Sequence, residues 1–130
     1  MDRIDKILNH DLFLYHLGKN NAAEADRRFC RHSMVHFLDV ARIGTIIALE
    51  EGLELDREWI YAAALLHDCG KHEQYENGTP HEQASARIAP EILKDCGFDD
   101  KETDVIVTAI SRHRDPEAAK EKNLNGVLYR

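Results

Sequence analysis

The chain has 130 residues, which is enough for one domain with a buried core and too short for two ordinary domains. Charged residues make up 32% and hydrophobic residues 43%, as in ordinary globular proteins, and no apolar run is long enough to cross a bilayer. The formal net charge of −7 disfavours a protein whose main task is to bind nucleic acid, because that task needs a basic surface. The N-terminal residues lack the apolar core of a secretion signal, so we expect a cytoplasmic protein.

Apolar side chains recur at helical spacing along the chain, and no stretch keeps the alternation of a β-strand. We therefore predict a single all-α domain over residues 1–130, folded as a compact helical bundle. The predicted helices span, in chain order, residues 2–17, 22–31, 32–51, 59–69, 81–89 and 99–113, with a last helical segment after Pro116.

Turn and cap residues mark the boundaries between these helices. The stretch Gly18–Asn21 is expected to end the first helix, and Gly70 is expected to end the 59–69 helix in the left-handed conformation. Pro90 is expected to break the helix that begins near His81, or to start another turn. Residues 73–79 predict a turn or an exposed loop at the mouth of the space that the helices enclose. The apolar face predicted for the 32–51 helix consists of Val35, Leu38, Val40, Ile43, Ile46, Ile47 and Leu49.

Cysteine and histidine usage narrows the kind of site that this domain can hold. The three cysteines, Cys30, Cys69 and Cys96, have no CxxC spacing, so we expect reduced thiols rather than a disulfide framework or a thiolate zinc site. The eight histidines are the clear compositional oddity, and several lie near apolar helical positions.

The dipeptide His67-Asp68 closes an apolar helical run that contains Ala62, Ala63 and Ala64. Burying an imidazole and a carboxylate side by side is costly unless a cation or polar partners satisfy them. His32, His81 and His113 fall at the ends or inner faces of three other predicted helices. Taken singly, a histidine of this kind is more often a surface or hydrogen-bonded core residue than a metal ligand. Together with His67-Asp68 they form a His/carboxylate set suited to Mn, Fe, Ni, Co or Zn ions.

These residues resemble the HD-domain metal-dependent phosphohydrolase superfamily, whose pattern is a first His, an adjacent His-Asp pair and a distal Asp. The matching stretches are residues 31–35, which contain His32, and residues 64–71, which contain His67-Asp68. Residues 79–86 resemble the third-histidine helix of the subgroups with extra ligands, and residues 110–113 resemble their next histidine.

The resemblance implies an all-α domain that holds one or two divalent metal ions (Mn, Fe, Co, Ni, Mg or Zn) and cleaves phosphate esters, commonly of nucleotides. His32, His67 and Asp68 would bind the first ion, and Asp68 would bridge to a second ion held by His81 and His113. The expected partner is thus a small phosphorylated substrate, and a homodimer is compatible with a helical domain of this size.

The resemblance also suggests residues that contact the substrate. Lys71, which we group with Asp68 as catalytic, could approach a phosphate, although a solvated lysine at a helix end explains it nearly as well. The predicted substrate-binding residues are Arg28, Lys71, Arg112 and Arg114.

The chain departs from the superfamily pattern in two ways. The distal Asp is expected just past Arg130, where the sequence stops. Either the chain is truncated there, or another group completes the ligand shell. That group could be water, a partner chain, or a carboxylate such as Asp104 or Asp115. In addition, Arg112 and Arg114 flank His113 where some relatives have paired histidines.

Two alternatives to a phosphohydrolase stay open. The domain could be a non-catalytic sensor of a metal or nucleotide, or a structural helical domain with coincidental histidines. His32 and His36 also have the i, i+4 spacing of a zinc metallopeptidase, but Ser33 stands where the glutamate base is needed. We therefore interpret His36 as a packed residue or one that supports a ligand.

Overall fold

The computed structural model describes residues 1–23 and 34–129, and every regular element in these ranges is helical. The all-α prediction is therefore confirmed. Arg28, Cys30 and His32 lie outside the described residues, as does most of the helix predicted over residues 22–31. The helices are α1 (Asp2–Leu8), α2 (Asp11–Ala23), α3 (Met34–Glu50), α4 (Arg57–Leu66), α5 (Lys71–Asn77), α6 (His81–Asp95), α7 (Asp100–Ser111), the short 3₁₀ helix η1 (Pro116–Lys120) and α8 (Leu124–Tyr129).

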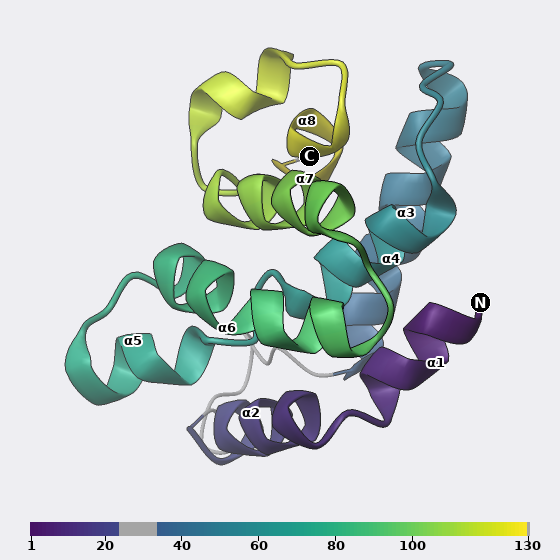
Figure 1. Cartoon of the computed structure of the whole chain (residues 1–130). Helices are drawn as coiled ribbons and strands as arrows, with labels where there is room; N and C mark the ends of the chain where they lie inside the picture. Colours follow the sequence, from purple (N-terminus) through teal and green to yellow (C-terminus); the bar gives the residue numbers. More distant parts are fainter. Residues whose placement is uncertain (24–33, 130) are drawn as a thin grey trace.

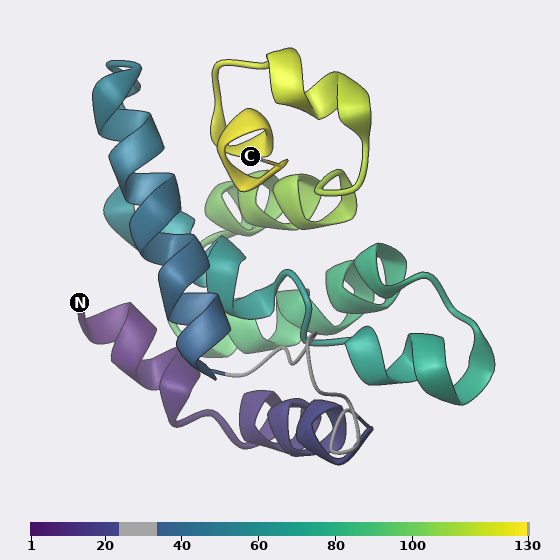
Figure 2. The ribbon, with the colours of Figure 1, turned by 180° about the vertical axis from the view of Figure 1, so that it is seen from behind.

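Helix α4 lies at the centre of the bundle and contacts α1, α3, α6, α7 and α8 (Figure 1). Figure 2 shows α3 lying across α4, with α7, η1 and α8 on one side and α1 and α2 on the other. The buried residues of α4 are Ile60, Ala62, Ala63, Ala64, Leu65 and Leu66. The alanines leave room for several helices to pack closely around α4. Asp56 caps the helix, because its side chain accepts a hydrogen bond from the Glu58 N–H at 2.8 Å.

The helix predicted over residues 2–17 is divided into α1 and α2. Helix α1 ends at Leu8, where the Asn9 side chain donates to the Asp5 carbonyl at 2.8 Å, and the His10 ring then accepts from the Leu12 N–H at 3.1 Å. The expected stop at Gly18–Asn21 is wrong, because α2 continues to Ala23. Asn20 is buried in tertiary contacts, and these outweigh the low helix propensity of Gly and Asn.

Two further boundaries differ from the sequence expectation. Residues 73–79 are mostly helical, because α5 runs to Asn77 before Gly78 ends it with a φ of 78°. Asn77-Gly78 therefore acts as a helix stop rather than as part of a long loop. Pro90 lies within α6 and does not break it. The buried residues Ile88, Ala89, Ile92 and Leu93 lie on both sides of Pro90, so packing holds the helix together.

Helix α3 packs through small side chains rather than through the full predicted apolar face. Its buried residues are Phe37, Ala41, Gly44 and Ala48. Four members of the predicted face are more than half exposed, namely Val35, Ile43, Ile46 and Leu49. A Cβ at Gly44 would lie 3.1 Å from Ile60 and 3.2 Å from Val127, so the close approach of α3 to α4 and α8 favours glycine there.

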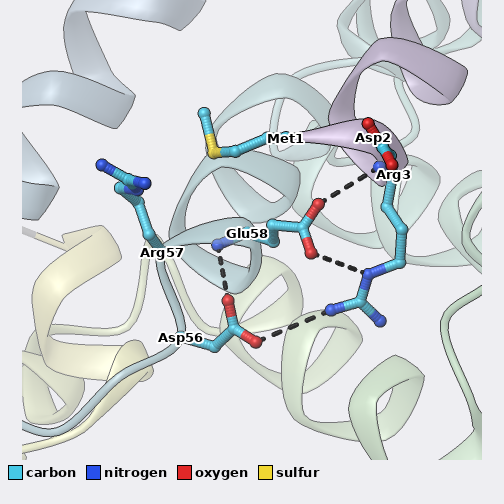
Figure 3. A pocket seen from close by; sticks show the side chains of 6 residues that line it. All are labelled: Met1, Asp2, Arg3, Asp56, Arg57 and Glu58. Atoms are coloured by element: carbon cyan, nitrogen blue, oxygen red, sulfur yellow. Dashed lines mark hydrogen bonds and ion pairs between the residues drawn. The ribbon is translucent and has the colours of Figure 1, made fainter.

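Arg3 ties α1 to the first turns of α4 and α7. Figure 3 shows its guanidinium between Asp56 and Glu58, with Nε donating to Glu58 at 2.9 Å. Its Nη1 donates to both carboxylate oxygens of Glu102 at 2.8 and 2.9 Å. Three of the charged residues that line the adjacent cavity of about 580 Å³, Arg3, Asp56 and Glu58, are engaged in these ion pairs, so we assign the cavity a structural role.

The Glu102 carboxylate, which binds Arg3, also accepts a hydrogen bond from the indole N–H of Trp59 at 2.7 Å. Glu102 and Asp99 together form the capping box at the start of α7. Partial burial would raise the pKa of the Glu102 carboxyl, but hydrogen bonds from Trp59, Asp99 and Arg3 hold it below its usual value. Because the folded-state pKa is lowered, the charge stabilises the fold above the unfolded value of 4.5, and this contribution is lost as the pH falls through the folded value.

We predict that Glu102→Gln lowers the free energy of unfolding at pH 7 by about 1–2 kcal/mol, because a charged acceptor of several hydrogen bonds becomes neutral. Urea denaturation between pH 3 and pH 7 measures this, and the difference from wild type should shrink at acidic pH. Glu117→Gln is the matched control, since Glu117 forms only an exposed pair with Lys120. Equal effects of the two substitutions would contradict the assigned role of Glu102.

Candidate metal centre

The carboxylate of Asp68 lies in the turn between α4 and α5, and its side chain is only 6% exposed. Its Oδ2 is 3.2 Å from Nε2 of His67, at the end of α4. Its Oδ1 is 3.4 Å from Nε2 of His81, the first residue of α6, and 3.5 Å from Nε2 of His113, which follows α7. The two oxygens of one buried carboxylate thus face three imidazoles from three parts of the bundle.

The atoms on the Oδ1 side have the spacing of ligands to a single ion. The Nε2 atoms of His81 and His113 are 3.1 Å apart, and Asp68 Oδ1 completes the triangle. Two nitrogen or oxygen ligands bound to one ion at tetrahedral or octahedral angles lie roughly 3.0–3.5 Å apart. These three donors therefore fit one divalent metal ion, and their His/carboxylate chemistry suits such ions.

The atoms on the Oδ2 side form a second group. One ligand atom each from His36, His67 and Asp68 lie within 4.8 Å of one another. The sequence placed His32 in this role, and His32 lies outside the described residues. Among the described residues, the structure brings His36, in the first turn of α3, to the group. The sequence signal for His36 was its i, i+4 spacing from His32, and in the structure Val40 and Gly44 follow His36 by one and two helical turns and line the same cavity.

The ring orientations direct Nε2 of each buried imidazole toward Asp68. Nδ1 of His67 contacts the Ala64 carbonyl at 2.6 Å, and Nδ1 of His113 contacts the Ile110 carbonyl at 2.6 Å. Nδ1 of His81 contacts Oε1 of Gln74 at 2.8 Å. An oxygen acceptor at Nδ1 holds the ring proton there, which assigns the tautomer and leaves the Nε2 lone pair for a metal ion.

The surroundings of His81 and His67 shift their pKa values in opposite directions. Burial, helped by the nearby Lys71 and His113 and opposed by Asp68, lowers the pKa of His81 to about 4. Burial also opposes the charged form of His67, but the adjacent Asp68 charge and hydrogen bond leave the His67 pKa above its usual value. His81 is therefore neutral at physiological pH, which is the form that binds metal ions.

The turn that holds Asp68 is pressed against α6. The Gly70 N–H donates to Oγ of Ser85 at 2.9 Å, and the buried Cys69 lies beside the same residue. Gly70 has a φ of −95°, so the expected left-handed cap is wrong. A Cβ at Gly70 would lie 2.7 Å from both Cβ of Ala84 and N of Ser85. Glycine is needed here because the backbones of the turn and α6 approach so closely.

A cavity of about 300 Å³ opens from the histidines toward α3 and α8. Its other walls are largely apolar, and Arg114 contributes a positive charge. The lining residues are His36, Val40, Ile43, Gly44, His67, His113, Arg114, Val127, Leu128 and Tyr129. The volume is at the lower end of the range for small-molecule sites.

The other residues expected to contact substrate lie in different surroundings. Nζ of Lys71 is 3.4 Å from Nδ1 of His81, so its charge is close to the centre. Arg112 forms ion pairs with Glu121 and, at 3.1 Å, with Asp115, and these pairs hold its guanidinium. Arg28 lies outside the described residues.

The two carboxylates considered as substitutes for the distal Asp are engaged or exposed. Asp115 binds Arg112 and caps η1 by accepting from the Glu117 N–H at 3.0 Å. Asp104 is exposed on α7. Neither belongs to the two groups of ligand atoms found among residues 1–23 and 34–129.

Comparison with known proteins agrees with this geometry. The family model of the HD domain matches residues 34–129, which include His36, His67, Asp68, His81 and His113. The chain belongs to the HD domain family. HD domains are typical of metal-dependent hydrolases, and the His/Asp groups indicate divalent metal binding.

A protein from Clostridium beijerinckii, named only as an uncharacterized protein, is 47% identical over 130 residues. The match covers 100% of this chain and 81% of that relative. No solved structure matches the chain. Within the part of the chain that the structure describes, no helix has the length and hydropathy needed to cross a membrane.

The contact at Gly70 gives a prediction for the turn. Gly70→Ala should lower the free energy of unfolding by about 2–4 kcal/mol, because its Cβ clashes with backbone atoms of α6 and forces the turn to move. Thermal and urea unfolding would measure the loss. Gly18→Ala is the matched control in α2, where a Cβ meets no atom within 4 Å and helix propensity favours Ala. A Gly70→Ala protein as stable as wild type would contradict the close packing.

Proposed function

We propose that this HD domain is a metal-dependent phosphohydrolase that cleaves a phosphate ester or anhydride of a nucleotide or another small phosphorylated metabolite. The observation that carries the proposal is the position of Asp68, whose two carboxylate oxygens each face a different group of histidines. One carboxylate shared by two donor groups is suited to a pair of divalent ions, as required for phosphoryl transfer by two-metal chemistry.

Asp68, His36 and His67 would hold one ion, and Asp68, His81 and His113 the other. Bound ions would lower the pKa of a coordinated water and neutralise charge on the phosphoryl oxygens. The protein supplies the fixed orientation of the donors, since Ala64, Ile110 and Gln74 hold the three buried rings. Catalysis would depend on Asp68, because this buried carboxylate is common to both donor groups.

The charges near the cavity support an anionic substrate. The chain has a net charge of −7, so binding a phosphate needs local positive charge. Arg114 lines the cavity beside His113, and we propose that it binds the phosphoryl group or a second phosphate. Lys71 adds a charge close to His81. Arg112 is a weaker candidate because two carboxylates already hold its guanidinium.

The catalytic proposal predicts hydrolysis that depends on Asp68. Tag-free protein loaded with Mn, Co or Ni should release phosphate or a nucleoside from members of a panel of nucleoside mono-, di- and triphosphates. Asp68→Ala should reduce the rate at least about 100-fold, since it removes a donor common to both groups. Metal binding by the wild type without turnover of any panel member would instead favour the sensor alternative. Protein that retains no metal ion would favour the structural alternative.

The assignment of His36 has its own test. His36→Gln should weaken binding of one ion per chain by roughly 10–100-fold, measured by calorimetry and elemental analysis. His10→Gln is the matched control, because His10 pairs with the exposed Asp95 and lies outside both donor groups. His32→Gln compares the sequence prediction directly with the structure. If His32→Gln removes the ion and His36→Gln does not, the sequence-based choice of His32 is correct.

A further inference from the structure

The side chain of Asn20, near the end of α2, lies between two backbone groups that flank the Asp68 turn. Its Nδ2 donates to the Asp68 carbonyl at 3.0 Å, and its Oδ1 accepts from the His72 N–H at 2.8 Å. Asn20 is only 1% exposed. A buried amide whose donor and acceptor are both used in this way is a well-defined structural contact.

The Asp68 carbonyl and the His72 N–H, which both bond to Asn20, would bond to each other if the helix were continuous. In a continuous helix the His72 N–H would donate to the Asp68 carbonyl, because residue i bonds residue i−4. Here the Asn20 amide stands between them and satisfies both groups. The Asp68 carbonyl also accepts from the Lys71 N–H at 3.0 Å, a tighter turn than that of an α-helix. Insertion of a side chain into the helical ladder is a recognised cause of a sharp change in helix direction.

The interruption separates α4 from α5 at the point where Asp68 must face the histidines. Helix α4 ends at Leu66 and α5 begins at Lys71, so the metal-binding pair lies in the intervening turn. Without the inserted amide, the backbone on both sides of Asp68 would be free to close the ladder. The direction of the Asp68 side chain therefore depends on a residue 48 positions earlier in the chain.

A second contact fixes α2 against the same segment. The rings of His16 and His72 stack with centroids 5.0 Å apart, and Nδ1 of His16 is 2.7 Å from Nε2 of His72. Both side chains are buried. His16 lies one helical turn before Asn20 on α2, so this contact orients the face of the helix that carries the amide.

We infer that Asn20 is a positioning residue for the metal centre, through which α2 sets the direction of the Asp68 carboxylate. This inference rests on the proposed metal-binding function. Helix α2 precedes residues 34–129, the range matched by the family model, so the contact comes from outside the matched domain.

The sharpest test is Asn20→Asp, which keeps the size and the acceptor for His72 but removes the N–H donor to the Asp68 carbonyl. The affinity for Mn²⁺ should fall roughly 10–100-fold, as measured by calorimetry on the tag-free full chain. The visible absorption of bound Co²⁺ should also change, because the ligand geometry shifts. Asn20→Ser, a smaller polar substitution, provides a second variant if Asn20→Asp does not fold.

The control is Lys19→Ala on the same helix, where the side chain forms an exposed ion pair with Glu76 at 3.3 Å. It should leave both the Mn²⁺ affinity and the Co²⁺ spectrum unchanged. Urea unfolding of the metal-free variants separates positioning from a merely structural role. If folded Asn20 variants lose stability but bind Mn²⁺ as tightly as wild type, the inference is overturned. If the wild type itself binds no divalent ion, the proposed function fails as well.

Discussion

The burial of the Asp68 carboxylate is the constraint on which the rest of the site depends. A buried charge costs several kcal/mol unless partners compensate it, and this one is enclosed by residues from four separate segments of the chain. Three imidazoles face its oxygens, and each is held by an oxygen acceptor on the far side of the ring. Such an arrangement is costly as a stabilising device and well suited to a bound cation. The donor geometry and the membership of the HD domain family therefore point to the same centre.

Helix α4 makes this arrangement possible because three consecutive alanines lie in its second half. Ala62, Ala63 and Ala64 allow α3, α6, α7 and α8 to surround one short helix. Gly44 and Gly70 extend the same principle to its neighbours, since a Cβ at either position would meet another element within about 3 Å. Close packing of small residues places the ends of several helices within ligand distance of one carboxylate. The same packing keeps those ends from moving independently.

The sequence identified the features that depend on local pattern. Helical periodicity gave the all-α class, and His67-Asp68 with its apolar run predicted the centre of the proposed site. His81 and His113 followed from their places at helix ends. The choice between His32 and His36 could not be made in this way, because the two residues are four positions apart in the sequence and would share one face of the predicted helix; the structure describes His36 alone. The left-handed conformation predicted for Gly70 was wrong for a similar reason. The sequence does not distinguish a glycine required by a left-handed φ from one required by the close approach of another backbone.

The contact between Asn20 and the Asp68 turn shows the limit of local reasoning most clearly. Nothing near Asn20 marks it, and the expected role of Gly18–Asn21 was to stop a helix. Its partners are a carbonyl and an N–H group, which are present at nearly every position and leave no trace in the sequence. Yet an amide side chain is one of the few groups that can replace a helical hydrogen bond on both sides, since it carries N–H donors and a carbonyl acceptor next to each other. A chain that must turn beside a buried carboxylate, without leaving backbone groups unsatisfied, needs such a residue from elsewhere in the fold.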